Sequence, residues 1–192
     1  MGYKLKTAPT IEPITLAEAK IHLKVDSDTT DDLLISALIS AAREACEKYT
    51  GRVFIEQSWE YVFEDFKDDE IELDNPPLIS VTSLTYKDIS GVTETIATSV
   101  YDVDTHSYPG SIFLKFGQLW PLVQDVENAI MVTYKAGYGA TAASVPASIM
   151  AAMLLIIGHL YENREDVITG RQVNELPKGS KYLLDPFKVY CI

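Results

Sequence analysis

The chain has 192 residues, of which 47% are hydrophobic and 10% aromatic, which is enough for one sizeable core or for one domain that carries an insertion. Its 16 basic and 28 acidic residues give a formal net charge of −12, and this balance argues against a protein that grips nucleic-acid phosphates. Two widely spaced cysteines, with no signal-like or bilayer-length apolar run, predict no structural disulfide, no membrane segment and synthesis in the cytoplasm.

Two helices are predicted near the amino terminus. Thr15 and Glu18 have the spacing of a capping box, which predicts a short helix that ends near Val25. A second, longer helix is expected to begin at Asp31 and Asp32, since apolar residues then recur every three or four positions. Gly51 is suited to the left-handed position that ends it.

The hydrophobic period changes after this helix. Residues 53–63 alternate between apolar and more polar types, which predicts one long strand. Further strands are expected at 71–73, 79–86, 92–96, 111–116 and 129–134, separated by turn signals rich in Pro, Gly, Asn and Asp. Short strands at this spacing are typical of a small antiparallel sandwich or barrel.

A helical period returns after Pro146, and we expect a helix over residues 147–162 and one last helical turn at 181–184. The fold class is therefore α+β. A small helical domain of residues 1–52 and 137–192, with two N-terminal helices and a C-terminal apolar helix, is predicted to carry an inserted antiparallel β domain of residues 53–136.

The 147–162 helix is apolar nearly all round, so it must be covered all round. The two N-terminal helices offer too little surface, and we expect one face to contact a neighbouring subunit; the alternative is that the sheet covers this face within one chain. The glutamates at the polar end of the helix oppose the helix dipole, so we expect them to be held either by Arg164 or by another subunit. The predicted oligomer interface is Met150, Met153, Leu154, Ile157, Tyr161, Glu162, Arg164 and Glu165.

The polar segment that follows is predicted to become ordered against a neighbour. It holds four sizeable apolar residues, which are too few to offset the conformational entropy of ordering about fifteen residues. The residues expected to dock are Val167, Ile168, Val173 and Leu176.

No catalytic, metal or cofactor site is predicted. The three histidines lack metal-ligand spacing, and the acidic run 64–70 lacks the pattern of a calcium loop and is expected to be a solvated hairpin tip. The glycines at 137 and 139 do not continue into a phosphate-binding loop. Trp59, Tyr61 and Phe63 are expected to face the core rather than to form a platform for sugars or bases. We therefore expect no enzyme and no cofactor.

Four passages carry a resemblance to a known family. They are ITLAEAK (14–20) with LKVD (23–26); DDLL (31–34) with AARE (41–44) and YTGR (49–52); YKAGYG (134–139) with VP (145–146); and LYENRE (160–165) with LLDP (183–186). In this order they resemble the head–tail connector family of tailed bacteriophages, the adaptor ring bound beneath the portal.

The resemblance implies a virion structural protein of the neck, at the head–tail junction. Its expected partners are further copies of itself in a ring of twelve, the portal protein and a head-closure or tail-completion protein, with duplex DNA passing through the ring without specific binding. Two alternatives remain open: a head-closure or tail-completion protein of the same neck, and a carbohydrate-binding β module.

Overall fold

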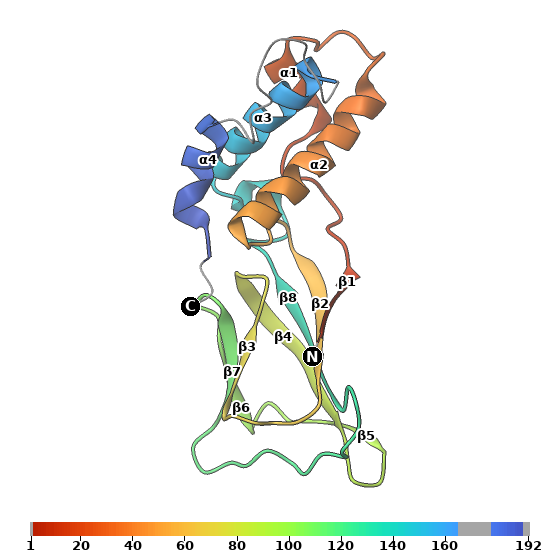
Figure 1. The fold of residues 1–192 in the computed structure, drawn as a ribbon, viewed down its shortest axis with the longest axis vertical. Helices are drawn as coiled ribbons and strands as arrows, with labels where there is room; N and C mark the ends of the chain where they lie inside the picture. Colours follow the sequence, from red (N-terminus) through yellow and green to blue (C-terminus); the bar gives the residue numbers. More distant parts are fainter. Residues whose placement is uncertain (1, 165–177, 190–192) are drawn as a thin grey trace. The chain divides into compact units, whose positions relative to one another are not determined.

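The computed structural model describes residues 2–164 and 178–189. The chain forms two compact units, each built from two separate stretches of sequence. We call Met1–Pro9 with Glu56–Gly139 the β unit, and Thr10–Ile55 with Ala140–Ile192 the helical unit. Figure 1 shows the strands in the first unit and the helices in the second.

The described part of the helical unit has four helices and two short 3-10 turns. They are α1 (Leu16–Leu23), α2 (Asp32–Thr50), η1 (Ala142–Ser144), α3 (Ala147–Glu162), α4 (Lys178–Leu184) and η2 (Asp185–Phe187). The central helix is α3, because it contacts α1, α2 and α4, and Figure 1 shows it between α2 and α4.

The helix ends follow local signals in the sequence. The Thr15 hydroxyl accepts a hydrogen bond from the Glu18 N–H (3.2 Å), and the Thr15 N–H donates to Glu18 Oε2 (2.8 Å), which confirms the predicted capping box. Helix α2 ends at Gly51, whose φ of 68° is the left-handed conformation that favours glycine. Helix α4 begins at Lys178, three residues before the single turn that the sequence predicts.

Arg43 ties three segments of the helical unit together. Its side chain, on α2, is almost buried and contacts Glu12 from the segment before α1 (2.8 Å) and Glu47 one turn along (2.7 Å). The second carboxylate oxygen of Glu47 accepts the Phe54 N–H (2.9 Å), so the chain that leaves α2 is held by the same group. Burial raises the pKa of Glu47, while Arg43 opposes the shift.

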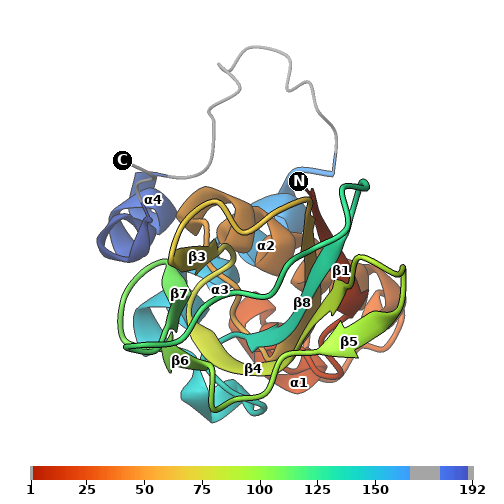
Figure 2. The same ribbon diagram turned by 90° about the horizontal axis from the view of Figure 1, so that it is seen from below.

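The described part of the β unit has eight strands. They are β1 (Gly2–Thr7), β2 (Gln57–Phe63), β3 (Glu70–Leu73), β4 (Leu78–Lys87), β5 (Thr93–Thr95), β6 (Tyr101–Asp104), β7 (Gly110–Leu114) and β8 (Ile130–Ala136). All pairings are antiparallel, in one sheet of order β1-β2-β8-β4-β5 and a second of order β3-β7-β6. Figure 2 shows the second sheet on one side of this unit and β1, β8 and β5 on the other.

These sheets confirm the predicted α+β class and the antiparallel pairing. Each sheet keeps two edges among the described strands, β1 and β5 in one and β3 and β6 in the other, so they form two open sheets rather than a closed barrel. Where Gly110 of β7 faces Leu78 of β4 there is room only for hydrogen, because a Cβ added at Gly110 would lie 2.6 Å from Leu78 Cβ.

The β unit differs from the prediction at three strands. The long strand predicted from residue 53 begins at Gln57, because Val53, Phe54 and Ile55 are all buried in the helical unit and do not alternate. Strands β1 and β6 were not predicted. The residues of β1 do alternate, Tyr3 and Leu5 with Lys4 and Lys6, and this short pattern was overlooked. All six residues are exposed, and β1 is established by its pairing with β2.

Candidate functional site

The buried face of α3 is formed by residues that recur every three or four positions. Ile149, Ala152, Met153, Ile156 and Ile157 are at most 3% exposed, and the neighbouring helices of the same chain cover them. A second face remains accessible. It comprises Ala151, Leu155, His159 and Glu162, which lie on one side of the helix and are all exposed; Leu155 is 40% exposed. We call these four residues the outer stripe of α3.

The predicted interface residues of α3 divide between these two environments. Met153 and Ile157 are 0% exposed, so they belong to the core of the helical unit and are not accessible to a neighbour. Met150, Leu154 and Tyr161 are half-buried. The exposed members are Glu162 and Arg164, and Glu165 lies outside the described residues.

A polar cluster joins the end of α3 to the start of α2. The Tyr161 hydroxyl donates to Asp31 Oδ2 (2.7 Å), and Arg164 Nη2 donates to the same oxygen (2.6 Å). The guanidinium also lies over the Tyr161 ring, 4.8 Å from its centroid. The hydrogen bond from Tyr161, followed by that from Arg164, lowers the pKa of Asp31. The carboxylate that pairs with Arg164 therefore comes from its own chain.

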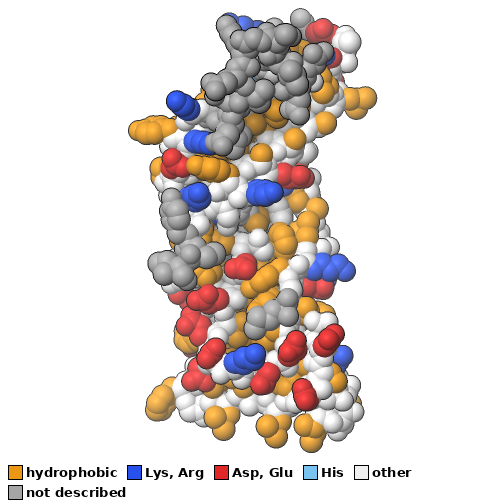
Figure 3. Space-filling model, viewed as in Figure 1, with side chains coloured by type: hydrophobic (Ala, Val, Ile, Leu, Met, Phe, Trp, Pro, Cys, Tyr) orange, Lys and Arg blue, Asp and Glu red, His pale blue; other side chains and the backbone are white. Residues whose placement is uncertain are grey.

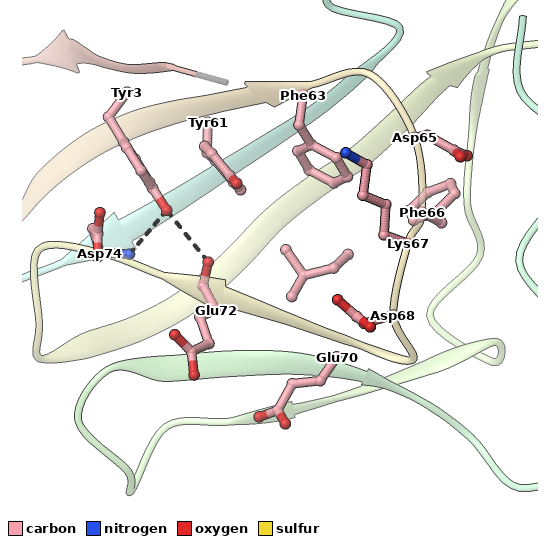
Figure 4. Close-up of a pocket in the computed structure, with 11 residues that line it drawn as sticks. Tyr3, Tyr61, Phe63, Asp65, Phe66, Lys67, Asp68, Glu70, Glu72 and Asp74 are labelled. Atoms are coloured by element: carbon pink, nitrogen blue, oxygen red, sulfur yellow. Dashed lines mark hydrogen bonds between the residues drawn. The ribbon is translucent and has the colours of Figure 1, made fainter. Parts of the chain in front are cut away.

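The β unit contains a cavity of about 580 Å³ beside β3, shown in Figure 4. Its walls come from β1, β2, the β2–β3 loop and β3. The aromatic lining residues are Tyr3, Tyr61, Phe63 and Phe66, and the acidic ones are Asp65, Asp68, Glu70, Glu72 and Asp74. Lys67 and Ile71 complete the lining. We call this space the acidic aromatic cavity.

Its aromatic rings form a continuous row. Tyr3 stacks on Tyr61, with ring centroids 4.2 Å apart, and Tyr61 lies 5.0 Å from Phe63. Phe63 meets the edge of Phe66 at 5.9 Å, and Phe66 stacks on Trp120 at 4.5 Å. Such offset and edge-to-face contacts are favourable beyond the area they bury. The row therefore gives the cavity a rigid wall.

Tyr3 closes one end of the cavity. Its hydroxyl donates to the Glu72 carbonyl oxygen (3.3 Å) and accepts from the Asp74 N–H (3.5 Å), as the dashed lines in Figure 4 mark. Burial raises the pKa of this hydroxyl, and the Asp74 carboxylate raises it further, so the phenol stays neutral at physiological pH. The net charge of the cavity is thus set by its carboxylates and Lys67.

The other residues considered in the sequence do not form a reactive site. The described residues hold no group of three or more His, Cys, Asp or Glu placed to bind a metal ion. Cys46 is buried, which raises the pKa of its thiol to about 12. The expected docking residues Val167, Ile168, Val173 and Leu176 lie outside the described residues. None of the described helices is long and apolar enough to cross a membrane.

Sequence reasoning missed both polar sites because each depends on residues far apart in the chain. Asp31 was assigned to the start of α2, yet its carboxylate meets Arg164, 133 residues away. Tyr3 reaches the cavity only because β1 pairs with β2 so that Tyr3 lies opposite Tyr61. The run 64–70 is exposed for most of its length, as expected, but it is not a hairpin tip, because it joins β2 of one sheet to β3 of the other. Phe66 within it contacts the aromatic row.

Comparison with solved structures finds the same fold. The chain is similar to chains in "Neck of empty GTA particle computed with C6 symmetry" (21% identity, TM-score 0.82) and in "Virion of native gene transfer agent (GTA) particle" (21%, TM-score 0.81). A third match is "Neck of native GTA particle computed with C12 symmetry" (19%, TM-score 0.77). Each alignment covers 100% of this chain and 97% of the other.

No curated protein matches the chain in sequence. A family model does match it, however, and the match runs from residue 12 to residue 174. The model describes head completion proteins, and it spans both units and most of the chain. This agrees with the order of passages that resembles phage connectors, and the chain belongs to the head completion protein family.

Proposed function

We propose that this protein is a structural subunit of a virion neck, where twelve copies form a closed ring. The ring joins the portal of the DNA-filled head to the head-closure or tail proteins and extends the channel through which DNA passes. The family is one of structural rather than catalytic proteins.

One observation carries the proposal. The family match covers residues 12–174, and the whole chain superimposes on a chain from a neck with twelve-fold symmetry. A cyclic ring needs two different surfaces on each subunit, because neighbours meet head to tail. The outer stripe of α3 is our candidate for one of these surfaces. Met150 and Leu154, which are half-buried in the single chain, would extend it.

The Asp31–Tyr161–Arg164 cluster supports this assignment. It fixes the end of α3 against α2 through two hydrogen bonds to one carboxylate. A helix whose end is held presents its outer side chains in a single geometry, which lowers the entropy lost when a neighbour binds. Glu162 of the outer stripe and the nearby Arg164 are both exposed and can pair with charges of the next subunit.

Negative-stain or cryo-electron microscopy of the purified protein, alone and mixed with portal protein, tests the proposal. We expect a ring of twelve on the portal, and light scattering should show the same mass increase. Isolated subunits are expected to remain monomeric until the portal nucleates the ring. A strict monomer under both conditions would contradict it. Binding to the free end of a portal-bound connector, rather than to the portal itself, would instead assign the protein to head closure.

A further inference from the structure

The β unit carries most of the acidic charge of the protein. Its two stretches contain six basic and 15 acidic residues, a net charge of −9 out of −12 for the chain. Figure 3 shows Asp and Glu side chains gathered over this unit on the face in view. The acidic aromatic cavity opens within this field, and five carboxylates against one lysine line it. Anionic ligands are therefore repelled from the cavity, and cationic ones are attracted.

The cavity combines its carboxylates with the aromatic row, which can also attract a cation. Aromatic rings attract cations through the negative charge of their faces, and the attraction grows when the cation is partly removed from water. The β2 part of the wall, Tyr61 and Phe63, is nearly buried, while the carboxylates of β3 stay exposed at the rim. An apolar wall opposite an acidic rim fits a side chain with an alkyl stem and a charged tip.

We propose that the acidic aromatic cavity binds a lysine or arginine side chain from a basic, partly apolar segment of another neck protein. Only one part of this inference rests on the proposed neck role, namely that the basic segment comes from another neck protein. The cavity volume of about 580 Å³ holds one such side chain with part of its backbone.

A surface next to the cavity supports a protein segment as the occupant. Trp120, at the end of the aromatic row, donates its indole N–H to the Asp68 carbonyl oxygen (3.2 Å), so the loop that carries it is fixed at the cavity. The same loop exposes Phe116, Leu119 and Leu122 almost completely. Large apolar side chains exposed together mark sites of protein–protein contact. A basic segment with apolar neighbours would contact both features. A neutral sugar can stack on the rings and donate hydrogen bonds to the carboxylates, but it gains nothing from their net negative charge.

Lys67 provides an internal comparison. In Figure 4 its side chain runs along the cavity wall toward Phe63, from the same loop that carries Asp65 and Phe66. The wall therefore already lies beside the stem of a cationic residue of this chain. An incoming lysine or arginine has to displace this amine or share the cavity with it, so Lys67 is expected to weaken binding.

The test is a binding titration on the full-length protein with two probes. One is a dodecapeptide that alternates arginine and leucine, and the other carries glutamate in place of every arginine. The chain has two tryptophans, so a Trp59→Phe background leaves Trp120 as the reporter beside the cavity. We expect the arginine peptide to change the Trp120 fluorescence saturably, with binding that weakens as salt rises. The glutamate peptide should give no change.

Matched variants assign the binding to the cavity. The double variant Glu70→Gln with Glu72→Gln removes two rim carboxylates from exposed positions of β3, and we expect binding to weaken roughly three- to tenfold. Its control, Glu94→Gln with Glu127→Gln, removes the same charge from exposed positions of the β unit outside the cavity and should weaken binding less than about twofold. Lys67→Gln should strengthen it roughly two- to fivefold.

Several results would overturn the inference. They are equal affinity for both peptides, an equal loss of affinity for the arginine peptide in the two double variants, and weaker binding of that peptide after Lys67→Gln. Saturable binding of neutral oligosaccharides but not of the arginine peptide would replace it with a carbohydrate site. These outcomes are independent of ring formation. If the protein assembles on the portal but does not bind the arginine peptide, only the proposal for the cavity is contradicted.

Discussion

Asp31 accepts two hydrogen bonds on one carboxylate oxygen, and this arrangement makes its contribution depend on pH. Tyr161 and Arg164 both stabilise the ionised form, so the folded-state pKa of Asp31 lies below the value of the unfolded chain, near 4. The stabilisation from the ionised Asp31 carboxylate is fully present above the unfolded-state pKa, and it is lost as pH falls through the lower, folded-state pKa.

The Asp31→Asn variant is therefore expected to melt below wild type near neutral pH, and the difference should shrink as pH falls from about 5 to about 2. Thermal melts followed by circular dichroism across this range measure it. The exposed neighbour Asp26→Asn serves as control and should melt like wild type near neutral pH. A difference between Asp31→Asn and wild type that does not vary with pH would mean that the charge of Asp31 is not the source of the effect.

Arg43 differs from Asp31 because its charged side chain is nearly buried. Removing it leaves Glu12 and Glu47 facing each other without their cation. Arg43→Ala should lower the free energy of unfolding by roughly 3–5 kcal/mol, the range for breaking a buried ion pair. Arg43→Lys keeps the charge but cannot reach both carboxylates in the same geometry, so we expect a smaller loss. Urea denaturation compares the two, and equal losses would show that charge, not geometry, is what the site requires.

At the scale of elements, the sequence predicts well wherever the signal is local. The capping box of Thr15 and Glu18, the left-handed Gly51 and the start of α3 after Pro146 depend on residues within a few positions of one another. Burial does not separate the strands that were predicted from those that were not, since the fully exposed β5 was predicted and β6 was not. The short alternation of Tyr3 and Leu5 with Lys4 and Lys6 in β1 was overlooked, and pairing with β2 establishes that strand.

The same distinction applies to the candidate sites. The apolar character of α3 was evident from the sequence, but which of its faces is covered depends on α1, α2 and α4 together. Met153 and Ile157 were assigned to the interface and lie in the core, because a stripe pattern cannot tell an intramolecular neighbour from an intermolecular one. The acidic aromatic cavity could not be predicted, since it needs Tyr3 beside Tyr61 and Phe63 close to Phe66.

Two substitutions on opposite sides of α3, two residues apart, should separate its two faces. Leu155→Glu places a charge on the outer stripe, where a helix tolerates glutamate, so the monomer should keep its melting temperature within a few degrees while assembly on the portal is lost. Ile157→Ala empties a fully buried position and should cost about 2–5 kcal/mol of stability. Normal ring formation by a folded Leu155→Glu protein would remove the outer stripe from the interface.

At the scale of the whole molecule, charge is distributed unevenly between the two units. The helical unit holds ten basic and 13 acidic residues, a net charge of only −3 against −9 for the β unit. Net charge of this size favours solubility and speeds encounters with partners of opposite charge. We therefore expect a cationic partner to be attracted chiefly to the β unit, and we propose the helical unit, with its mixed charges, as the surface for contacts between identical subunits.

The same charge bears on the proposed DNA channel. Duplex DNA carries about one negative charge per 1.7 Å of its axis, and proteins that hold it do so by neutralising phosphates with Lys and Arg. We propose that a ring of subunits with a net charge of −12 each would offer few such contacts, so that DNA would move through it without being retained. We expect no binding to a fluorescent duplex at micromolar protein in about 0.15 M salt, as measured by anisotropy for both the free subunit and the portal-bound ring.

Lowering the salt should at most reveal weak, sequence-independent binding, because phosphate contacts strengthen as salt is removed. Micromolar binding at physiological salt would mean that basic side chains are concentrated on one surface despite the acidic balance, and that this surface, not a passive wall, meets the DNA.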